Sequence, residues 1–173
     1  MGEHNGAQRR AEVARILEAA AAPVSATSLA RRLSVSRQII VGDVALLRAG
    51  GARILATPRG YLLERRTEGV ERTVACVHTP EETQAELIAI GDAGGEVVDV
   101  IGEHPVYGQL TGILGVRSRY DVQEFVERVA RHGARPLSGL TDGIHLHTIR
   151  CQDEKSFQRV QKALAKEGFL LNA

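Results

Sequence analysis

Residues 34–63 read SVSRQIIVGDVALLRAGGARILATPRGYLL, and this stretch decides the fold of the first part of the chain. Ser36 is of the residue type that caps helices, and apolar residues follow it near helical spacing. A Gly-Gly pair at 50–51 can end this helix, and two short β runs then flank a turn at 58–60. The stretch therefore predicts a helix that leads into a β-hairpin.

The residues before this stretch predict two further helices. Residues 8–20 place small and apolar side chains near 3.6-residue spacing with arginines on the other face, and the alanines before Pro23 end the pattern. Residues 28–33, SLARRL, fit a short second helix that Ser25 or Thr27 can cap. Three helices followed by a hairpin are the order of a winged helix-turn-helix domain.

One face of the third predicted helix is suited to DNA. A helical projection turns Ile40 and Val44 toward a core, with Ile39 and Leu46 flanking them. Small residues on the outer face let a helix lie deep in the major groove, and Arg or Gln near its N-terminus can bond to bases or phosphates. The predicted DNA-binding residues are the outward positions and the arginine of the hairpin turn: Ser36, Arg37, Gln38, Val41, Gly42, Arg48 and Arg59.

Charge is distributed unevenly along the chain. Residues 1–66 carry 11 arginines and no lysine against 5 acidic residues, whereas residues 67–173 carry 11 basic and 16 acidic residues. A basic unit joined to an acidic unit is expected when only the first faces a polyanion. Charge therefore favours DNA binding over the alternative, a winged helix that binds protein.

Composition indicates a folded protein of two domains. The 173 residues are 43% hydrophobic and 25% charged, which suffices for an ordinary core. No stretch is apolar enough to cross a membrane, charged residues stand where a signal peptide needs its apolar segment, and the two cysteines form no disulfide framework. We expect a cytoplasmic protein without a membrane partner, with domains at 1–66 and 67–173.

The second domain has the pattern of an α+β fold. Strand and helix signals give the order β-α-β-β-α-β-α-β, which fits an α/β sandwich. Thr79, Pro80 and Glu82 form a capping-box signature at the first helix of this domain. A break at 102–105 is expected between the two middle strands, and a short strand is expected after the last helix.

The histidines of this domain indicate a metal site. His145 and His147 are two residues apart on a predicted strand, so both side chains leave the same face. His78 ends the first strand, and Glu86 lies about two turns into the capped helix. If the two strands are neighbours, three imidazoles and one carboxylate converge, a donor set that suits zinc, nickel, cobalt or iron(II) better than calcium or magnesium. Unrelated surface or core histidines are the alternative.

Other features leave rival functions open. Cys76 and Cys151 could be ligands or redox-sensitive neighbours of the site, although a free cysteine is more often a small buried hydrophobe. A metal-dependent hydrolase and a metal- or redox-sensing regulator are therefore alternatives. The sequence has no nucleophile-elbow, zinc-protease, phosphate-loop or dinucleotide motif, which disfavours an enzyme.

Several strings of the sequence resemble a known family. Residues 34–63 resemble the N-terminal winged helix of the nicotinic-acid-responsive transcription repressors, which control NAD biosynthesis and niacin uptake genes in bacteria. HPVYG at 104–108 and LTDGIHLHT at 140–148 are similar to the three-histidine domain of the same family. The resemblance runs in order from about residue 8 to 173. It departs from the family pattern at Gly42, where a polar residue is expected.

The resemblance implies a homodimeric repressor that binds double-stranded operator DNA with nicotinic acid as co-repressor, and not an enzyme. It also implies one divalent transition metal per chain, nickel or zinc, and its metal positions map onto His78, Glu86, His145 and His147. By sequence proximity, Tyr107 or Arg150 is expected to orient the far end of the effector.

Overall fold

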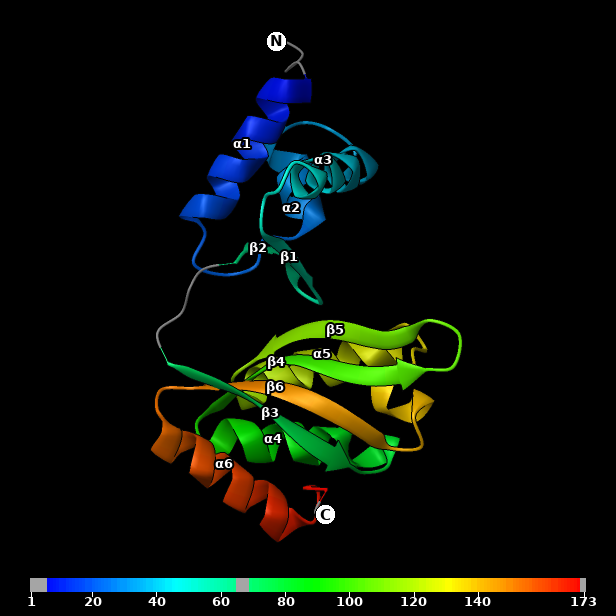
Figure 1. Ribbon diagram of the computed structural model, residues 1–173. Helices are drawn as coiled ribbons and strands as arrows, with labels where there is room; N and C mark the ends of the chain where they lie inside the picture. Colours follow the sequence, from blue (N-terminus) through cyan, green and yellow to red (C-terminus); the bar gives the residue numbers. More distant parts are fainter. Residues whose placement is uncertain (1–5, 65–68, 172–173) are drawn as a thin grey trace. The chain divides into compact units, whose positions relative to one another are not determined.

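The computed structural model describes residues 6–64 and 69–171, which fall into two compact units, Met1–Arg66 and Thr67–Ala173. Figure 1 shows the helix-rich first unit and the four-stranded sheet of the second. None of the helices in the described ranges is long and apolar enough to cross a membrane.

The first unit is a winged helix-turn-helix, as the sequence predicts. Its elements in chain order are α1 (Gly6–Ala19), α2 (Ala26–Arg32), α3 (Arg37–Ala49), β1 (Ile54–Thr57) and β2 (Gly60–Leu63). Ser36 caps α3, because its hydroxyl oxygen accepts a hydrogen bond from the Ile39 N–H at 3.3 Å. The strands pair antiparallel, and Val24 adds a single bridge to Tyr61. Fully buried side chains from all three helices form its core: Val13, Leu17, Leu29, Ile40 and Val44.

Two residues at the edges of the inward face of α3 are more exposed than the helical projection predicts. Ile39 and Leu46 are 41% and 59% exposed and do not join the core. Asp43 is the polar residue of the inward face, and its carboxylate accepts hydrogen bonds from the Arg9 guanidinium of α1. This ion pair therefore ties the third helix to the first.

The second unit is a four-stranded antiparallel sheet with helices on one face (Figure 1). The strand order is β3-β6-β4-β5, so the two strands that carry the predicted ligands are neighbours. The core lies between the sheet and α4, α5 and α6. The elements in chain order are β3 (Val70–Val77), η1 (Pro80–Glu82), α4 (Thr83–Asp92), β4 (Gly95–His104), β5 (Gly108–Val116), α5 (Arg119–Arg131), η2 (Leu137–Leu140), β6 (Ile144–Cys151) and α6 (Glu154–Glu167).

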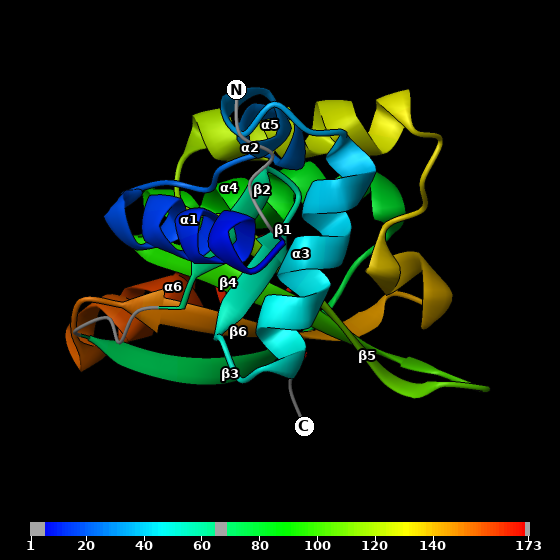
Figure 2. The ribbon, with the colours of Figure 1, turned by 90° about the horizontal axis from the view of Figure 1, so that it is seen from above.

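Three boundaries in this unit differ from the sequence prediction. The final strand is reduced to one bridge between Leu170 and Cys76. The break expected at 102–105 lies further on, because β4 continues to His104 before the hairpin turn, and this hairpin projects beyond the other strands (Figure 2). The helix expected from Thr79 opens with a 3₁₀ turn, in which the Thr79 N–H donates to Glu82 Oε2 at 2.8 Å.

Candidate metal centre and DNA-reading helix

The structure brings the four predicted ligands together. Glu86 Oε2 lies 2.7 Å from His78 Nε2 and 3.1 Å from His147 Nε2, and Glu86 Oε1 lies 3.3 Å from His145 Nε2. The four residues are between 0% and 6% exposed. We call His78, Glu86, His145 and His147 the histidine cluster.

Strand pairing and backbone carbonyls orient the three imidazoles. Cys76 pairs with His145 across β3 and β6, so the end of β3 delivers His78 beside the β6 histidines. The Nδ1 atoms of His78, His145 and His147 lie 2.6–2.9 Å from the carbonyl oxygens of Thr79, Gly143 and Asp99, respectively. A carbonyl only accepts, so each Nδ1 carries a proton and donates it. In a neutral ring, each Nε2 then presents a lone pair to the cluster.

A β-bulge positions the backbone carbonyl that accepts a hydrogen bond from the His147 ring. The register between β4 and its neighbours shifts between Val97 and Asp99, and the Asp99 carbonyl beside this bulge accepts from His147. The Asp99 side chain also accepts the Thr148 N–H at 3.0 Å, which holds the two strands together here. Bulges often re-aim groups next to functional sites, and this one serves the histidine cluster.

The donor set fits a transition-metal ion. If the imidazoles are neutral and carry their proton on Nδ1, three Nε2 lone pairs face the Glu86 oxygens. Acceptors that face one another in a buried site repel, so only protons or a cation can stabilise the arrangement. Ligand atoms that share one ion at 2.0–2.1 Å lie about 3.0–3.4 Å apart, close to the Glu86–imidazole distances above. Three nitrogens and a carboxylate suit zinc or nickel better than a hard cation.

The electrostatics of the cluster also favour positive charge beside Glu86. Burial raises the pKa of the Glu86 carboxyl, but hydrogen bonds that His145, His147 and His78 donate through Nε2 when protonated outweigh burial and hold its pKa well below its ordinary value. Burial lowers the pKa of His78, but its hydrogen bond to Glu86 and the carboxylate charge raise it overall. The cluster is therefore built around an ionised carboxylate that needs a positive partner.

Cys76 lies at the edge of the cluster. Its Sγ, a Glu86 carboxylate oxygen and a ring nitrogen of His145 lie within 4.8 Å of one another. Burial raises the pKa of the Cys76 thiol, and the Glu86 charge raises it further, so without a metal this thiol is protonated and a poor nucleophile near neutral pH. Burial also raises the pKa of Cys151. Both cysteines are buried, which matches the prediction of small core residues.

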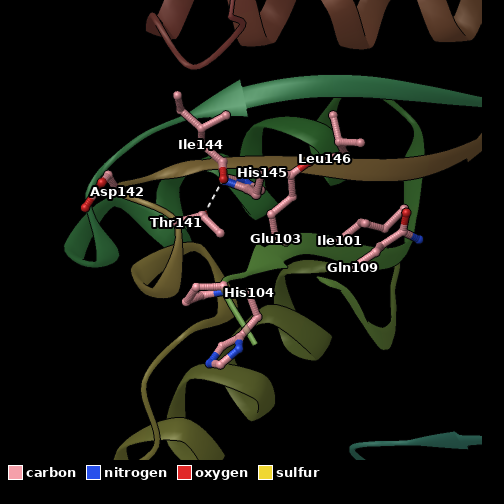
Figure 3. Close-up of a pocket in the computed structure, with 11 residues that line it drawn as sticks. Ile101, Glu103, His104, Gln109, Thr141, Asp142, Ile144, His145 and Leu146 are labelled. Carbon is pink, nitrogen blue, oxygen red and sulfur yellow. Dashed lines mark hydrogen bonds between the residues drawn. The ribbon is translucent and has the colours of Figure 1, made fainter. Parts of the chain in front are cut away.

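Two cavities adjoin the histidine cluster. The inner one, of about 20 Å³, holds an ion or one water but no pyridine ring, and Phe125, Leu137 and Ser138 are among its walls. The outer one, of about 540 Å³, lies between the β4–β5 hairpin and the turn before β6, and its lining residues are drawn in Figure 3. His145 lines both cavities. The sequence did not predict that residues of η2 line the inner cavity, because only the tertiary fold places η2 beside β6.

The two residues expected to orient an effector do not line either of these cavities. Strand alternation turns Arg150 away from the face of β6 that carries His147, and its guanidinium binds Glu71 and Glu96 at 2.7 and 3.2 Å. Tyr107 is 73% exposed in the hairpin turn and is not among the lining residues of either cavity. Their contacts with an effector therefore stay predictions.

Most of the predicted DNA-binding residues are exposed in the first unit, but Val41 and Arg59 are half-buried. Val41 is half-buried and packs against the core, so it is less outward than the projection places it. Gly42 is exposed, and a Cβ built there meets nothing within 4 Å. Arg59 lies in the hairpin turn. The remaining predicted residues are exposed at the start or end of α3: Ser36, Arg37, Gln38 and Arg48.

Comparison with known proteins agrees with this division of the chain. Residues 9–62 match a family described as an HTH domain, and residues 71–173 match the 3H domain. A probable transcription repressor, NiaR of Thermotoga maritima, is 48% identical over 164 residues, which cover 95% of this chain and 94% of that protein. The transcription repressor NadR of Bacillus subtilis is 40% identical over 170 residues, covering 96% and 94%.

These likenesses extend over nearly the whole length of the chain and include both units. They exclude the hydrolase alternative, because the relatives are named as repressors and the first unit is a DNA-binding domain. The chain belongs to the family of transcription repressors with an HTH domain and a 3H domain that includes NiaR and NadR, and it is a regulator and not an enzyme.

Proposed function

We propose that this repressor is a homodimer that senses niacin and controls genes of NAD biosynthesis or niacin uptake, with nicotinic acid as co-repressor at a divalent-metal site. The observation that carries the proposal is the histidine cluster, in which three Nε2 atoms surround one buried carboxylate. Three nitrogen donors and a carboxylate suit a transition-metal ion, so this buried set in a DNA-binding protein favours a sensing role.

Nickel or zinc would be held by His78, Glu86, His145 and His147 in this proposal. The ion would supply a positive charge and a Lewis-acid position for an anionic pyridine ligand. The chain's own contribution is to orient the ligands, because the carbonyls of Thr79, Gly143 and Asp99 hold each imidazole with Nε2 directed inward.

Access for the effector is proposed through the outer cavity. Its aliphatic residues Ile101, Ile144 and Leu146 suit the face of a pyridine ring. Its rim carries Glu103 and Asp142 and no lysine or arginine, so an anion gains no attraction from the cavity itself. Nicotinate should therefore bind only when the metal supplies positive charge, and its ring reaches the ion only if the inner cavity widens.

DNA recognition would use α3 from each copy of a two-fold dimer. The backbone around Gly42 is open, and Arg37 and Gln38 stand at the N-terminal end of the helix, where side chains reach base edges or phosphates. Two recognition helices about 34 Å apart would read half-sites one turn of DNA apart. Nicotinate would favour the arrangement that matches this spacing.

The test is a fluorescence-anisotropy titration of labelled promoter DNA from the chain's own niacin genes. Nicotinate should raise the operator affinity of the zinc- or nickel-loaded protein about tenfold or more, the usual size of allosteric coupling. Metal-stripped protein should show no nicotinate effect, and H147A should behave like stripped protein. Equal nicotinate effects with and without metal would contradict the proposal, and nicotinamide in place of nicotinate distinguishes the two effectors.

The small inner cavity favours a second candidate, a metal-sensing repressor. An ion fits the cavity of about 20 Å³ without rearrangement, whereas a pyridine ring does not. In that case metal alone would change operator affinity, and nicotinate would add nothing in the same titration.

A further inference from the structure

One edge of the sheet in the second unit is open to another strand. Within the described residues, β5 has a neighbouring strand, β4, on one side only. Its sequence, GQLTGILGV, contains no charged residue and no proline. Charges, prolines, short length and β-bulges are the usual means by which proteins prevent edge strands from pairing. This nine-residue strand has no charge and no proline, and its one register shift falls between Ile113 and Val116, near the end of the strand.

The opposite edge is protected. β3 carries Glu71 and Arg72, and the segment after α6 covers the other end of the strand. There the Val77 N–H donates to Phe169 O at 2.9 Å, and the Leu171 N–H donates to Ala75 O at 2.9 Å. The difference between the two edges points to β5 as the edge that pairs.

Large exposed apolar side chains flank β5 at both ends. Val106 and Tyr107, immediately before the strand, are 77% and 73% exposed, and Tyr120, four residues after it, is 72% exposed. These are the three most exposed large apolar side chains in the described part of the chain. Exposed apolar side chains before and after the open strand favour an interaction surface along it.

We propose that β5 pairs antiparallel with β5 of a second copy of this chain, through residues 108–114, to form one continuous eight-stranded sheet. The inference rests on the proposed homodimer and names its surface. A strand paired with itself across a two-fold axis is self-complementary, as a symmetric dimer requires. The pairing also sets the Val106–Tyr107 end of one copy beside the Tyr120 end of the other.

Charge complementarity supports the same arrangement. Exposed Glu103 lies opposite Gln109 at one end of β5, and exposed Arg117, which also pairs with Glu96 of its own chain at 3.6 Å, follows the other end. Antiparallel pairing brings the acidic end of each copy to the basic end of the other. Stable protein–protein interfaces bury roughly 1,200–2,000 Å² of surface in total. The exposed side chains at both ends of β5 would add to the area that strand pairing alone buries.

The proposed dimer predicts a short distance between the two copies of a β5 residue and a long distance between the two copies of a β3 residue, which serves as the control. Thr111 is exposed near the middle of β5, so its two copies would lie within about two strand spacings, or ~10 Å. Thr73 is exposed on β3, seven strand spacings from its symmetry mate, or about 34 Å in a flat sheet. Spin labels on T111C and on T73C, in the full chain, therefore report different distances by pulsed electron resonance. The native cysteines are buried and poorly reactive.

A short distance at position 111 with a long one at position 73 supports the proposal. A dimeric protein with a long distance at position 111 overturns it and leaves the repressor proposal intact. A monomer at micromolar concentration overturns this proposal and removes the dimer premise of the repressor as well, whereas the nicotinate titration tests the metal site separately.

Matched substitutions give a second measurement. T111K places a charge on each copy near the two-fold axis and should weaken the dimer at least tenfold in sedimentation equilibrium, because like charges then oppose each other. T73K adds the same charge to the protected edge and should leave the dimer unchanged. Unaltered far-ultraviolet circular dichroism would show that both variants fold. Equal dimer affinity in the two variants contradicts the proposal.

Discussion

Gly143 shows how a single residue can shape the histidine cluster. Its φ is +88°, and a Cβ there would lie 2.5 Å from the carbonyl oxygen of His78. Its own carbonyl oxygen accepts the His145 Nδ1–H at 2.9 Å. A glycine therefore lets the start of β6 lie directly against the end of β3, where two of the four cluster residues meet.

Replacing this glycine should weaken metal binding without removing a ligand. In G143A the methyl group displaces the His78 backbone, and a 10- to 100-fold loss of zinc affinity is expected, the usual effect of disturbing the groups behind the ligands. A competition titration with a chromophoric chelator measures it. G133A is the control, because Gly133 also has a positive φ but open space around it. Equal zinc affinity in the two variants would refute this role for Gly143.

His78 gives the metal-free protein a pH dependence. Burial disfavours its charged form, but the Glu86 carboxylate outweighs burial and raises the His78 pKa. A raised pKa stabilises the fold below the ordinary value of about 6.5, and this stability is lost as pH rises through the folded pKa. Metal-free protein should therefore unfold at a lower temperature at about pH 8 than at about pH 6.

Bound metal should stabilise the protein more at the higher pH than at the lower pH. Protons compete with the ion for Nε2, so the increase in unfolding temperature that zinc produces should be larger at about pH 8 than at about pH 6. Scanning calorimetry with and without zinc at both pH values measures the two differences. A metal-free protein that is more stable at the higher pH would show that His78 is not protonated in the fold.

The four cluster residues could be predicted, but their surroundings could not. Alternation along one strand placed His145 and His147 on a common face, and the capping signature placed Glu86 in the helix that follows His78. Because a 3₁₀ turn opens this segment, Glu86 lies in the first turn of α4. The carbonyl acceptors depend on a bulge and a turn whose positions follow from tertiary pairing. The partners of Arg150 also come from tertiary pairing, since Glu71 lies on β3 and Glu96 on β4, and its role toward an effector stays a prediction.

Among the secondary-structure elements, α3 contains a glycine that lowers helix stability but leaves the surface of the helix open at that position. Gly42 lies inside this helix, where glycine is less stable than alanine by about 0.5–1 kcal/mol. Since a Cβ there meets nothing within 4 Å, G42A should raise the free energy of unfolding by about that amount.

The same substitution should weaken operator binding if the α3 backbone approaches DNA closely. Opposite signs for stability and DNA affinity are therefore expected in G42A, measured by urea unfolding and fluorescence anisotropy. G91A in α4 is the control, since an added Cβ there makes only an ordinary contact with Arg117 O. An unchanged operator affinity in G42A would show that the backbone stays away from the bases.

Arg37 tests the DNA-reading end of the same helix. R37A should weaken operator binding by about 1–3 kcal/mol if the guanidinium contacts a base, and should leave zinc content unchanged. R131A is the comparison, because Arg131 is exposed at the end of α5 in the other unit. The idea fails if both variants bind the operator as the unaltered protein does.

The sequence predicts most elements well and their packing less well. The helices and the hairpin of the first unit follow from periodicity and caps, and the structure confirms them. Ile39 and Leu46 were placed beside the core, but their burial depends on where α1 and α2 pack, which periodicity along α3 does not contain. Up to residue 171, the last expected strand forms a single bridge, Leu170 to Cys76, which the backbone hydrogen bonds of Phe169 and Leu171 to β3 flank.

At the scale of the whole molecule, the uneven charge distribution accords with the two units. The basic unit carries the helix-turn-helix, and the acidic unit carries the histidine cluster. The strand order β3-β6-β4-β5 joins residues more than sixty positions apart, and a single sequence gives no direct signal for such pairing. The open edge of β5 became visible only once this order was known.

The most direct test of the account is the donor set of the bound metal. X-ray absorption at the zinc edge of the full-length, zinc-loaded protein should show only nitrogen and oxygen neighbours at about 2.0–2.1 Å, with the outer scattering of imidazole rings. A sulfur neighbour at about 2.3 Å would instead assign Cys76 as a ligand and contradict the cluster of three histidines and Glu86.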